Sequence, residues 1–90
     1  MNRPTITLEL FGMPRARAGV KEVVVLASTV GEALAEVIKE CPKLADVFRT
    51  DGTLAPHYLL SLDGQQFISD LSHPLRSGDR LLLLSADAGG

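Results

Sequence analysis

A run of four leucines, Leu81–Leu84, lies close to the C-terminus of this 90-residue chain and restricts the possible folds more than any other segment. Apolar side chains at successive positions point to both faces of a sheet, so the run predicts a fully buried, central β-strand. After Ser85 the chain continues only with small residues and one carboxylate, and it ends in Gly89-Gly90. Glycine has no Cβ, which gives this end wide backbone freedom and a narrow cross-section. We therefore expect a rigid domain over residues 1–85 and a flexible, threadable tail over residues 86–90.

Length and composition limit the possible functions. Ninety residues suit one domain with a single small core, and the few aromatic residues make that core aliphatic. The net charge of −2 and the scattered basic residues argue against nucleic-acid binding. Cys41 is the only cysteine, so neither an intrachain disulfide nor a cysteine-based metal site is expected. Because no apolar segment is long enough for a signal peptide or a membrane span, we expect a cytoplasmic protein without membrane contact.

The first third of the chain predicts two strands. Residues 5–11 alternate between apolar and polar side chains, which is typical of a half-buried strand. Gly12 and Pro14 are expected to end it. Residues 13–21 then read as a long hairpin loop whose basic side chains are solvated. Residues 22–26 form the second strand, and the short connection favours antiparallel pairing with the first.

A helix is predicted next. Thr29 and Glu32 fit a capping box, in which each side chain bonds the backbone N–H of the other residue. Apolar residues then follow at helical spacing: Val30, Leu34, Val37, Ile38 and Cys41. This stripe must pack on the sheet, and Pro42 marks the end of the helix.

The remaining segments complete a sheet. Leu44, Val47 and Phe48 are expected to form a short helical turn. Residues 58–62 predict a third strand, and residues 65–68 predict a short fourth strand or β-bridge after a turn. The fold class is therefore α+β, with one main helix packed on one face of a mixed four- to five-stranded sheet. With the last strand parallel to the first, this is the β-grasp, or ubiquitin-like, fold.

Several short motifs also resemble those of one known family. They are Leu10-Phe11, Ser28-Thr29-Val30, Leu62-Asp63-Gly64, Leu75-x-x-Gly78-Asp79-Arg80-Leu81 and the terminal Gly89-Gly90. Together they resemble the ubiquitin-like sulfur carriers of the MoaD/ThiS type, which include the small subunit of molybdopterin synthase and the thiamin-pathway sulfur carrier. The resemblance covers essentially the whole chain.

This resemblance implies a mechanism centred on Gly90. An activating enzyme would use ATP to adenylate the Gly90 carboxylate, and a persulfide sulfur would replace AMP to leave a thiocarboxylate. Gly89, Ala88 and Asp87 would thread into the enzyme. The implied partners are the adenylating enzyme, a sulfur donor such as a cysteine desulfurase or rhodanese-type protein, and a sulfur-accepting synthase. The chain itself would be a carrier and not an enzyme, with no catalytic residues, metal or tightly bound cofactor of its own.

The partner surface is expected around the last strand, because a helix covers only one face of the sheet. The residues proposed for it are Arg76, Arg80, Leu82 and Leu84. The alternative is that residues 42–56 cover these leucines. We expect a monomer that forms hetero-oligomers with its partners. Two alternatives remain open at this stage: a ubiquitin-like modifier conjugated through Gly90, and an interaction module without C-terminal chemistry.

Overall fold

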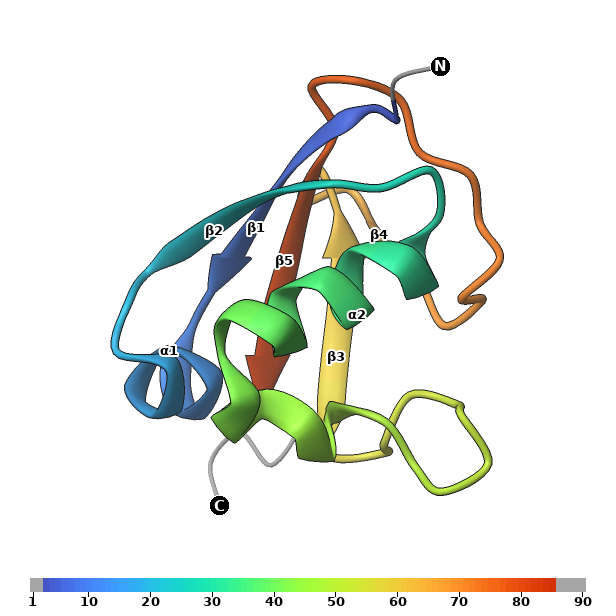
Figure 1. Cartoon of the computed structure of the whole chain (residues 1–90). Coiled ribbons are helices and arrows are strands. Elements are labelled where there is room, and N and C mark those ends of the chain that lie inside the picture. Colours follow the sequence, from blue (N-terminus) through green and yellow to red (C-terminus); the bar gives the residue numbers. More distant parts are fainter. Residues whose placement is uncertain (1–2, 86–90) are drawn as a thin grey trace.

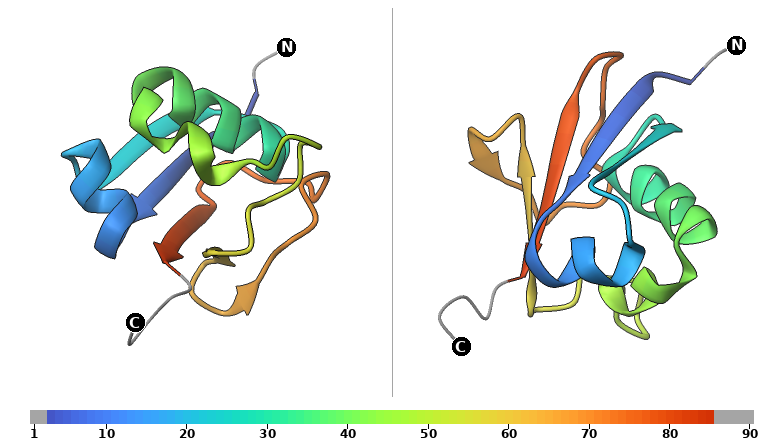
Figure 2. Two further views of the ribbon diagram at one scale, coloured as in Figure 1. Left: turned by 90° about the horizontal axis from the view of Figure 1, so that it is seen from below. Right: turned by 90° about the vertical axis from the view of Figure 1, so that its left-hand side faces the viewer.

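The structure, a computed structural model, describes residues 3–85 of the chain. Its elements in order are β1 (Thr5–Leu10), α1 (Gly12–Ala18), β2 (Glu22–Leu26), α2 (Val30–Glu40), the 3₁₀ helix η1 (Pro42–Val47), β3 (Tyr58–Leu62), β4 (Gln66–Phe67) and β5 (Arg80–Ser85). The helix α2 crosses one face of the sheet (Figure 1), and Figure 2 shows that no helix of the described residues covers the opposite face.

One five-stranded mixed sheet organises the molecule, with the strand order β2-β1-β5-β3-β4. The strand β1 pairs antiparallel with β2 and parallel with β5, and β5 pairs antiparallel with β3. The last strand therefore lies in the centre, parallel to the first, as the leucine run predicts. The β-grasp fold is confirmed. The strand β4 is shorter than expected, because only Gln66 and Phe67 pair with β3.

The main helix follows its predicted pattern. Its four fully covered residues, Val30, Ala33, Leu34 and Val37, face the sheet. The Thr29 hydroxyl accepts a hydrogen bond from the Glu32 N–H at 3.2 Å. The reciprocal bond differs from the predicted capping box, because the Glu32 carboxylate accepts from the Ser28 N–H, at 2.7 Å. The cap thus satisfies two backbone N–H donors, those of Glu32 and Ser28, and the second lies one residue before the Thr29 N–H that the capping box predicts.

The predicted hairpin loop over residues 13–21 is wrong, because a helix occupies most of it. Gly12 and Pro14 look like strand terminators, but Pro14 lies in the first turn of α1, where its missing N–H costs no intrahelical bond. Gly19 has a φ of 78°, a left-handed conformation that caps the helix, and its N–H donates to the Arg15 carbonyl at 2.9 Å. The residues that read as loop signals therefore begin and end a two-turn helix.

The core lies between the sheet and the helices. Its largest fully buried side chains come mainly from β1, α2 and β5, and they include Ile6, Leu8, Leu10, Leu34, Leu81 and Leu83. The predicted helical turn is present as η1, where Leu44 and Val47 are buried and Phe48 is partly buried just beyond. Because η1 packs against α2 and α1, it lies on the covered side of the sheet (Figure 2). The opposite face stays open.

Candidate functional site

The candidate site begins where the central strand ends. The strand β5 pairs with β1 up to Leu83 and with β3 up to Ser85, which lies opposite Tyr58. The Phe11 N–H also donates to the Leu83 carbonyl at 3.0 Å, so the segment between β1 and α1 holds the same end. The predicted threading residues Asp87, Ala88 and Gly89, and the predicted attachment site Gly90, lie outside the described residues. The structure thus provides a rigid base from which the last five residues begin.

The four leucines of β5 divide between the two faces of the sheet. Leu81 and Leu83 are completely buried in the core, whereas Leu82 and Leu84 on the open face are only partly buried. The prediction of a strand buried on both faces is therefore wrong, although its central position is right. Successive residues of a strand point to opposite faces of the sheet. Within residues 3–85, no helix covers the face that carries Leu82 and Leu84. Leu82 and Leu84 lie where a partner could reach them.

An apolar patch surrounds these two leucines. Leu59 lies opposite Leu84 across the β3–β5 pair and is 39% exposed, and Phe67 of β4 is 70% exposed. Ser61 of β3 lies between Phe67 and Leu82, because it is the pairing partner of both residues. We call Leu59, Phe67, Leu82 and Leu84 the open-face patch. Leu59 and Phe67 of this patch also line a hollow of about 450 Å³, together with residues that include Leu54, Ala55 and Pro56.

The sequence analysis missed Leu59 and Phe67. The alternation in β3 contains a signal for Leu59, because Tyr58 and Leu60 take the covered face and leave Leu59 on the other. Placing Leu59 beside Leu84 additionally requires the register between two strands that are about twenty residues apart in sequence. Phe67 follows only once β4 is known to pair through Ser61. An exposed cluster of this kind is typical of a protein interaction site.

The two arginines predicted for the partner surface differ in position. Arg80 begins β5, at the end away from Ser85, and its guanidinium pairs with Glu9 and lies 3.4 Å from a carboxylate oxygen of Glu22. The hydrogen bond to Glu9 raises the pKa of Arg80 above its usual value. Arg76 is exposed in the turn before β5, where its backbone N–H donates to Asp79 at 2.8 Å. Arg80 is thus paired with two carboxylates on the surface of the sheet. A role in partner binding stays a prediction for both arginines.

A polar cluster, which sequence reasoning did not identify, joins three elements near the end of β5. The Arg17 guanidinium of α1 donates to Asp46 of η1 at 2.5 Å and to the Tyr58 hydroxyl at 2.9 Å. The Tyr58 hydroxyl donates in turn to Asp46 at 2.8 Å. His57 lies beside this group, with its ring 4.5 Å from the Tyr58 ring and its Nε2 3.7 Å from Asp46. Arg17 is therefore a structural residue and not the solvated side chain that the loop interpretation expected.

The cluster alters the ionisation of its members. Burial and the hydrogen bond to Asp46 raise the pKa of Tyr58 to about 12, because both favour the neutral phenol. Desolvation alone would raise the pKa of Asp46, but the hydrogen bonds from Arg17 and Tyr58 outweigh it and lower that pKa. At neutral pH the cluster therefore holds one carboxylate, one guanidinium and a neutral phenol. It clamps α1 and η1 to the strand that pairs with the end of β5.

Other reactive side chains form no site with these residues. Cys41 is partly buried at the C-cap of α2. His73 is partly buried in the loop before β5, and its carbonyl accepts from the Val30 N–H at 3.0 Å. Between residues 3 and 85, no group of three or more metal-binding side chains comes together. Within the same residues, no helix is long and apolar enough to cross a membrane.

Comparison with known proteins identifies the relatives of this fold. No protein-family model and no curated protein matches the chain by sequence. The crystal structure of small archaeal modifier protein 1 from Haloferax volcanii matches with a TM-score of 0.84 and 30% identity, covering 96% of this chain and 99% of that one.

Two neighbours at lower identity come from solved complexes and share the fold. One is from the BexX/CysO complex of Amycolatopsis orientalis, with a TM-score of 0.81 and 21% identity, covering 94% of this chain and 99% of that one. The other is from the complex of subunits 1 and 2 of molybdopterin-converting factor from Helicobacter pylori 26695. It has a TM-score of 0.65 and 21% identity, covering 96% of this chain and 99% of that one.

Proposed function

The chain belongs to the MoaD/ThiS-type family of ubiquitin-like sulfur carriers, and from that membership we propose that Gly90 carries sulfur as a C-terminal thiocarboxylate. The observation that carries the proposal is the place where β5 ends. The central strand β5 pairs with β1 up to Leu83 and with β3 up to Ser85, and a short run of small residues that includes Gly89-Gly90 follows it in the sequence. A closed enzyme site could admit so narrow a segment.

The proposed chemistry has three steps, each performed by a partner protein. A Gly90 carboxylate oxygen attacks the α-phosphate of ATP, so that pyrophosphate leaves and an acyl adenylate forms. The terminal sulfur of a persulfide then attacks the acyl carbon, and AMP leaves. A thiol then attacks the inner, cysteine sulfur of the resulting acyl disulfide. The outer sulfur leaves with Gly90 as the thiocarboxylate, and the thiol and the cysteine sulfur form a disulfide. ATP is consumed by the activating enzyme and is not a resident cofactor of this chain.

The open-face patch supports this proposal, because it offers a docking area beside the strand that leads to the tail. Leu82, Leu84 and Leu59 form a partly exposed apolar surface there, and Phe67 extends it to the sheet edge. Burying such a surface against a partner is favourable by roughly 25 cal/mol per Å² of apolar area. We propose that the activating enzyme and the sulfur-accepting synthase dock on this patch in turn. The persulfide donor, such as a cysteine desulfurase or a rhodanese-type protein, would act at the activating enzyme.

The acceptor of the sulfur stays open within this proposal. A molybdopterin or thiamin precursor, or a similar biosynthetic intermediate, would take the sulfur from Gly90 in the same way. Because ATP and persulfide donors are cytoplasmic reactants, we propose that the carrier is loaded in the cytoplasm. We further propose that it is a monomer until it meets a partner.

A second function is favoured by one specific comparison. The solved structure with 30% identity is named a small archaeal modifier protein. The same acyl adenylate of Gly90 could be passed to a lysine amine of another protein, which would make this chain a ubiquitin-like modifier. The two fates share their activation step and differ in the nucleophile, either sulfur or nitrogen.

The activation step is tested by isotope exchange between labelled pyrophosphate and ATP, catalysed by the cognate activating enzyme. We expect exchange that depends on this chain, because adenylation of Gly90 is reversible. Deleting Gly90 should abolish it, whereas Cys41→Ser should leave it unchanged as the matched control. Chain-dependent exchange that survives the Gly90 deletion would overturn the proposal. A ladder of higher-mass conjugates in a cell lysate, lost with the same deletion, would favour the modifier instead.

A further inference from the structure

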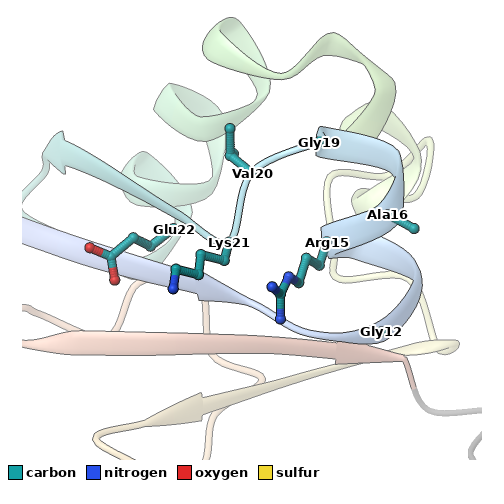
Figure 3. A pocket seen from close by; sticks show the side chains of 7 residues that line it. All are labelled: Gly12, Arg15, Ala16, Gly19, Val20, Lys21 and Glu22. Atoms are coloured by element: carbon teal, nitrogen blue, oxygen red, sulfur yellow. The ribbon is translucent and has the colours of Figure 1, made fainter.

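A shallow hollow lies between α1 and the beginning of β2 and carries two cationic side chains (Figure 3). It has a volume of about 820 Å³. Arg15 lines it from the helix, and Val20 and Lys21 line it from the connection to β2. The two cations thus approach one hollow from different elements, on a chain whose net charge is −2.

These cations are unpaired within the part of the chain that the structure describes. Arg15 and Lys21 form no ion pair there, whereas each of several other basic residues contacts a carboxylate: Arg3, Arg17, Lys39 and Arg80. Glu22 also borders the hollow, but its carboxylate lies 3.4 Å from the Arg80 guanidinium on the sheet. The charge of Arg15 and Lys21 is therefore available to an external anion.

Apolar side chains indicate what kind of anion fits. Val20 in the hollow is 44% exposed, and Met13, from the same short helix as Arg15, is 52% exposed. A small inorganic anion would leave these apolar surfaces in water. A protein segment could cover them while its carboxylates reach the cations, which is the usual mixture of apolar and charged contacts at protein interfaces.

The hollow lies next to the candidate site, on a rigid support. The helix α1 begins directly after Phe11, whose N–H donates to the Leu83 carbonyl of β5 at 3.0 Å. Arg17, two residues beyond Arg15, ties the same helix to Asp46 at 2.5 Å. Arg15 is thus held near the end of the central strand, where any protein that binds the C-terminus must approach.

From these observations we infer that the hollow of Arg15, Val20 and Lys21 docks a carboxylate-bearing segment of the protein that activates the C-terminus. This inference rests on the proposed function, because it takes the activating enzyme as the partner. The cations would steer that enzyme towards the end of β5, and Val20 would contact an apolar side chain of its acidic segment. The open-face patch would supply most of the contact area, while the hollow would set the direction of approach.

The test is the double charge reversal Arg15→Glu/Lys21→Glu, assayed in the ATP–pyrophosphate exchange reaction. We expect the KM of the activating enzyme for the variant to rise about tenfold at low ionic strength with kcat unchanged, because a charge at the rim of an interface acts mainly on association. The difference should shrink at high salt, where exposed charges are screened. The matched control Lys39→Glu/Arg49→Glu makes the same change in net charge away from the hollow and should change KM less than twofold. Equal KM values for the two double variants would overturn the inference.

A second measurement separates this inference from the proposed function. If no enzyme activates the wild-type chain, the proposed function fails, and a nuclear magnetic resonance titration with a capped hexaglutamate peptide then decides the docking surface. We expect amide shift changes in residues 15–22 with hexaglutamate, and none with hexaglutamine or in the Arg15→Glu/Lys21→Glu variant. Absence of shift changes with hexaglutamate would contradict the inference. A circular dichroism spectrum identical to wild type would establish that each variant is folded.

Discussion

The two faces of the sheet use the same residue type for different purposes. Leu81 and Leu83 of β5 are completely buried beneath the helices, whereas Leu82 and Leu84 of the same strand lie partly exposed on the open face. The covered pair stabilises the fold, because removing apolar surface from water is the main favourable term in folding. The open pair remains available for a partner. Neighbouring identical side chains thus differ in role only through the direction in which they point.

The largest expected effect is on the covered face. Leu83→Ala should lower the free energy of unfolding by about 3 kcal/mol, because it removes buried apolar groups and leaves a cavity. For a domain of this size, that loss corresponds to a drop in melting temperature of more than about 10 °C. Thermal unfolding followed by circular dichroism measures it. A decrease in the free energy of unfolding of less than about 1 kcal/mol would contradict the assignment of Leu83 to the stabilising core.

Tyr58, whose ring is buried on the covered face and whose hydroxyl is hydrogen-bonded to Asp46, should make the free energy of unfolding depend on alkaline pH. The pKa of Tyr58 is raised to about 12, so its phenol stays neutral in the folded chain at pH values where it ionises in the unfolded chain. The resulting stability is fully present below pH about 10 and is lost between about 10 and 12, by roughly 2–3 kcal/mol in total. Tyr58→Phe should lack that loss when both proteins are unfolded at a series of pH values.

Absorbance offers a direct check, because Tyr58 is the only tyrosine and the chain has no tryptophan. The tyrosinate band should appear with a midpoint near pH 12 in the folded protein, and near the ordinary value of about 10 in denaturant. A folded midpoint near 10 would contradict the partly buried hydrogen bond from Tyr58 to Asp46.

The smallest expected effect on stability is on the open face, where binding should change instead. Leu82→Ser/Leu84→Ser should cost less unfolding free energy per side chain than Leu83→Ala, because both side chains are already partly in water. The same change should raise the KM of the activating enzyme by about tenfold or more, as loss of apolar interface anchors does. The control Val24→Ser/Leu26→Ser alters two exposed residues of the same face on the edge strand β2. Equal KM values for the two variants would place the docking surface elsewhere.

Periodicity in the sequence predicted much of the fold, because each strand and the main helix carry a local pattern. The exception was α1. Gly12, Pro14 and Gly19 lie at or near the ends of this helix, but glycine and proline are also common in loops, so the sequence predicted a loop there. A short helix has too few turns for a periodic signal, and contacts such as Arg17 with Asp46 stabilise it from outside the segment. Sequence reasoning has no access to those contacts.

The candidate site was predicted less completely than the fold. Leu82 and Leu84, two of the residues proposed for the partner surface, lie partly buried on the open face, and their role in binding stays a prediction. Leu59 and Phe67 join them only through the register of three strands. Arg80 pairs with Glu9 and Glu22 on the surface of the sheet, which sequence reasoning did not predict, and its role in partner binding stays a prediction. Each of these outcomes depends on residues distant in sequence, which no local pattern specifies.

The central claim is that Gly90 carries the sulfur. The most direct test is the intact mass of the protein after incubation with ATP, a persulfide donor, a reducing thiol and the cognate activating enzyme. We predict a mass increase equal to the replacement of one oxygen by one sulfur, reversed by hydrolysis and absent when Gly90 is deleted. An unchanged mass, in a mixture where the exchange assay shows that adenylation occurs, would contradict the sulfur-carrier account.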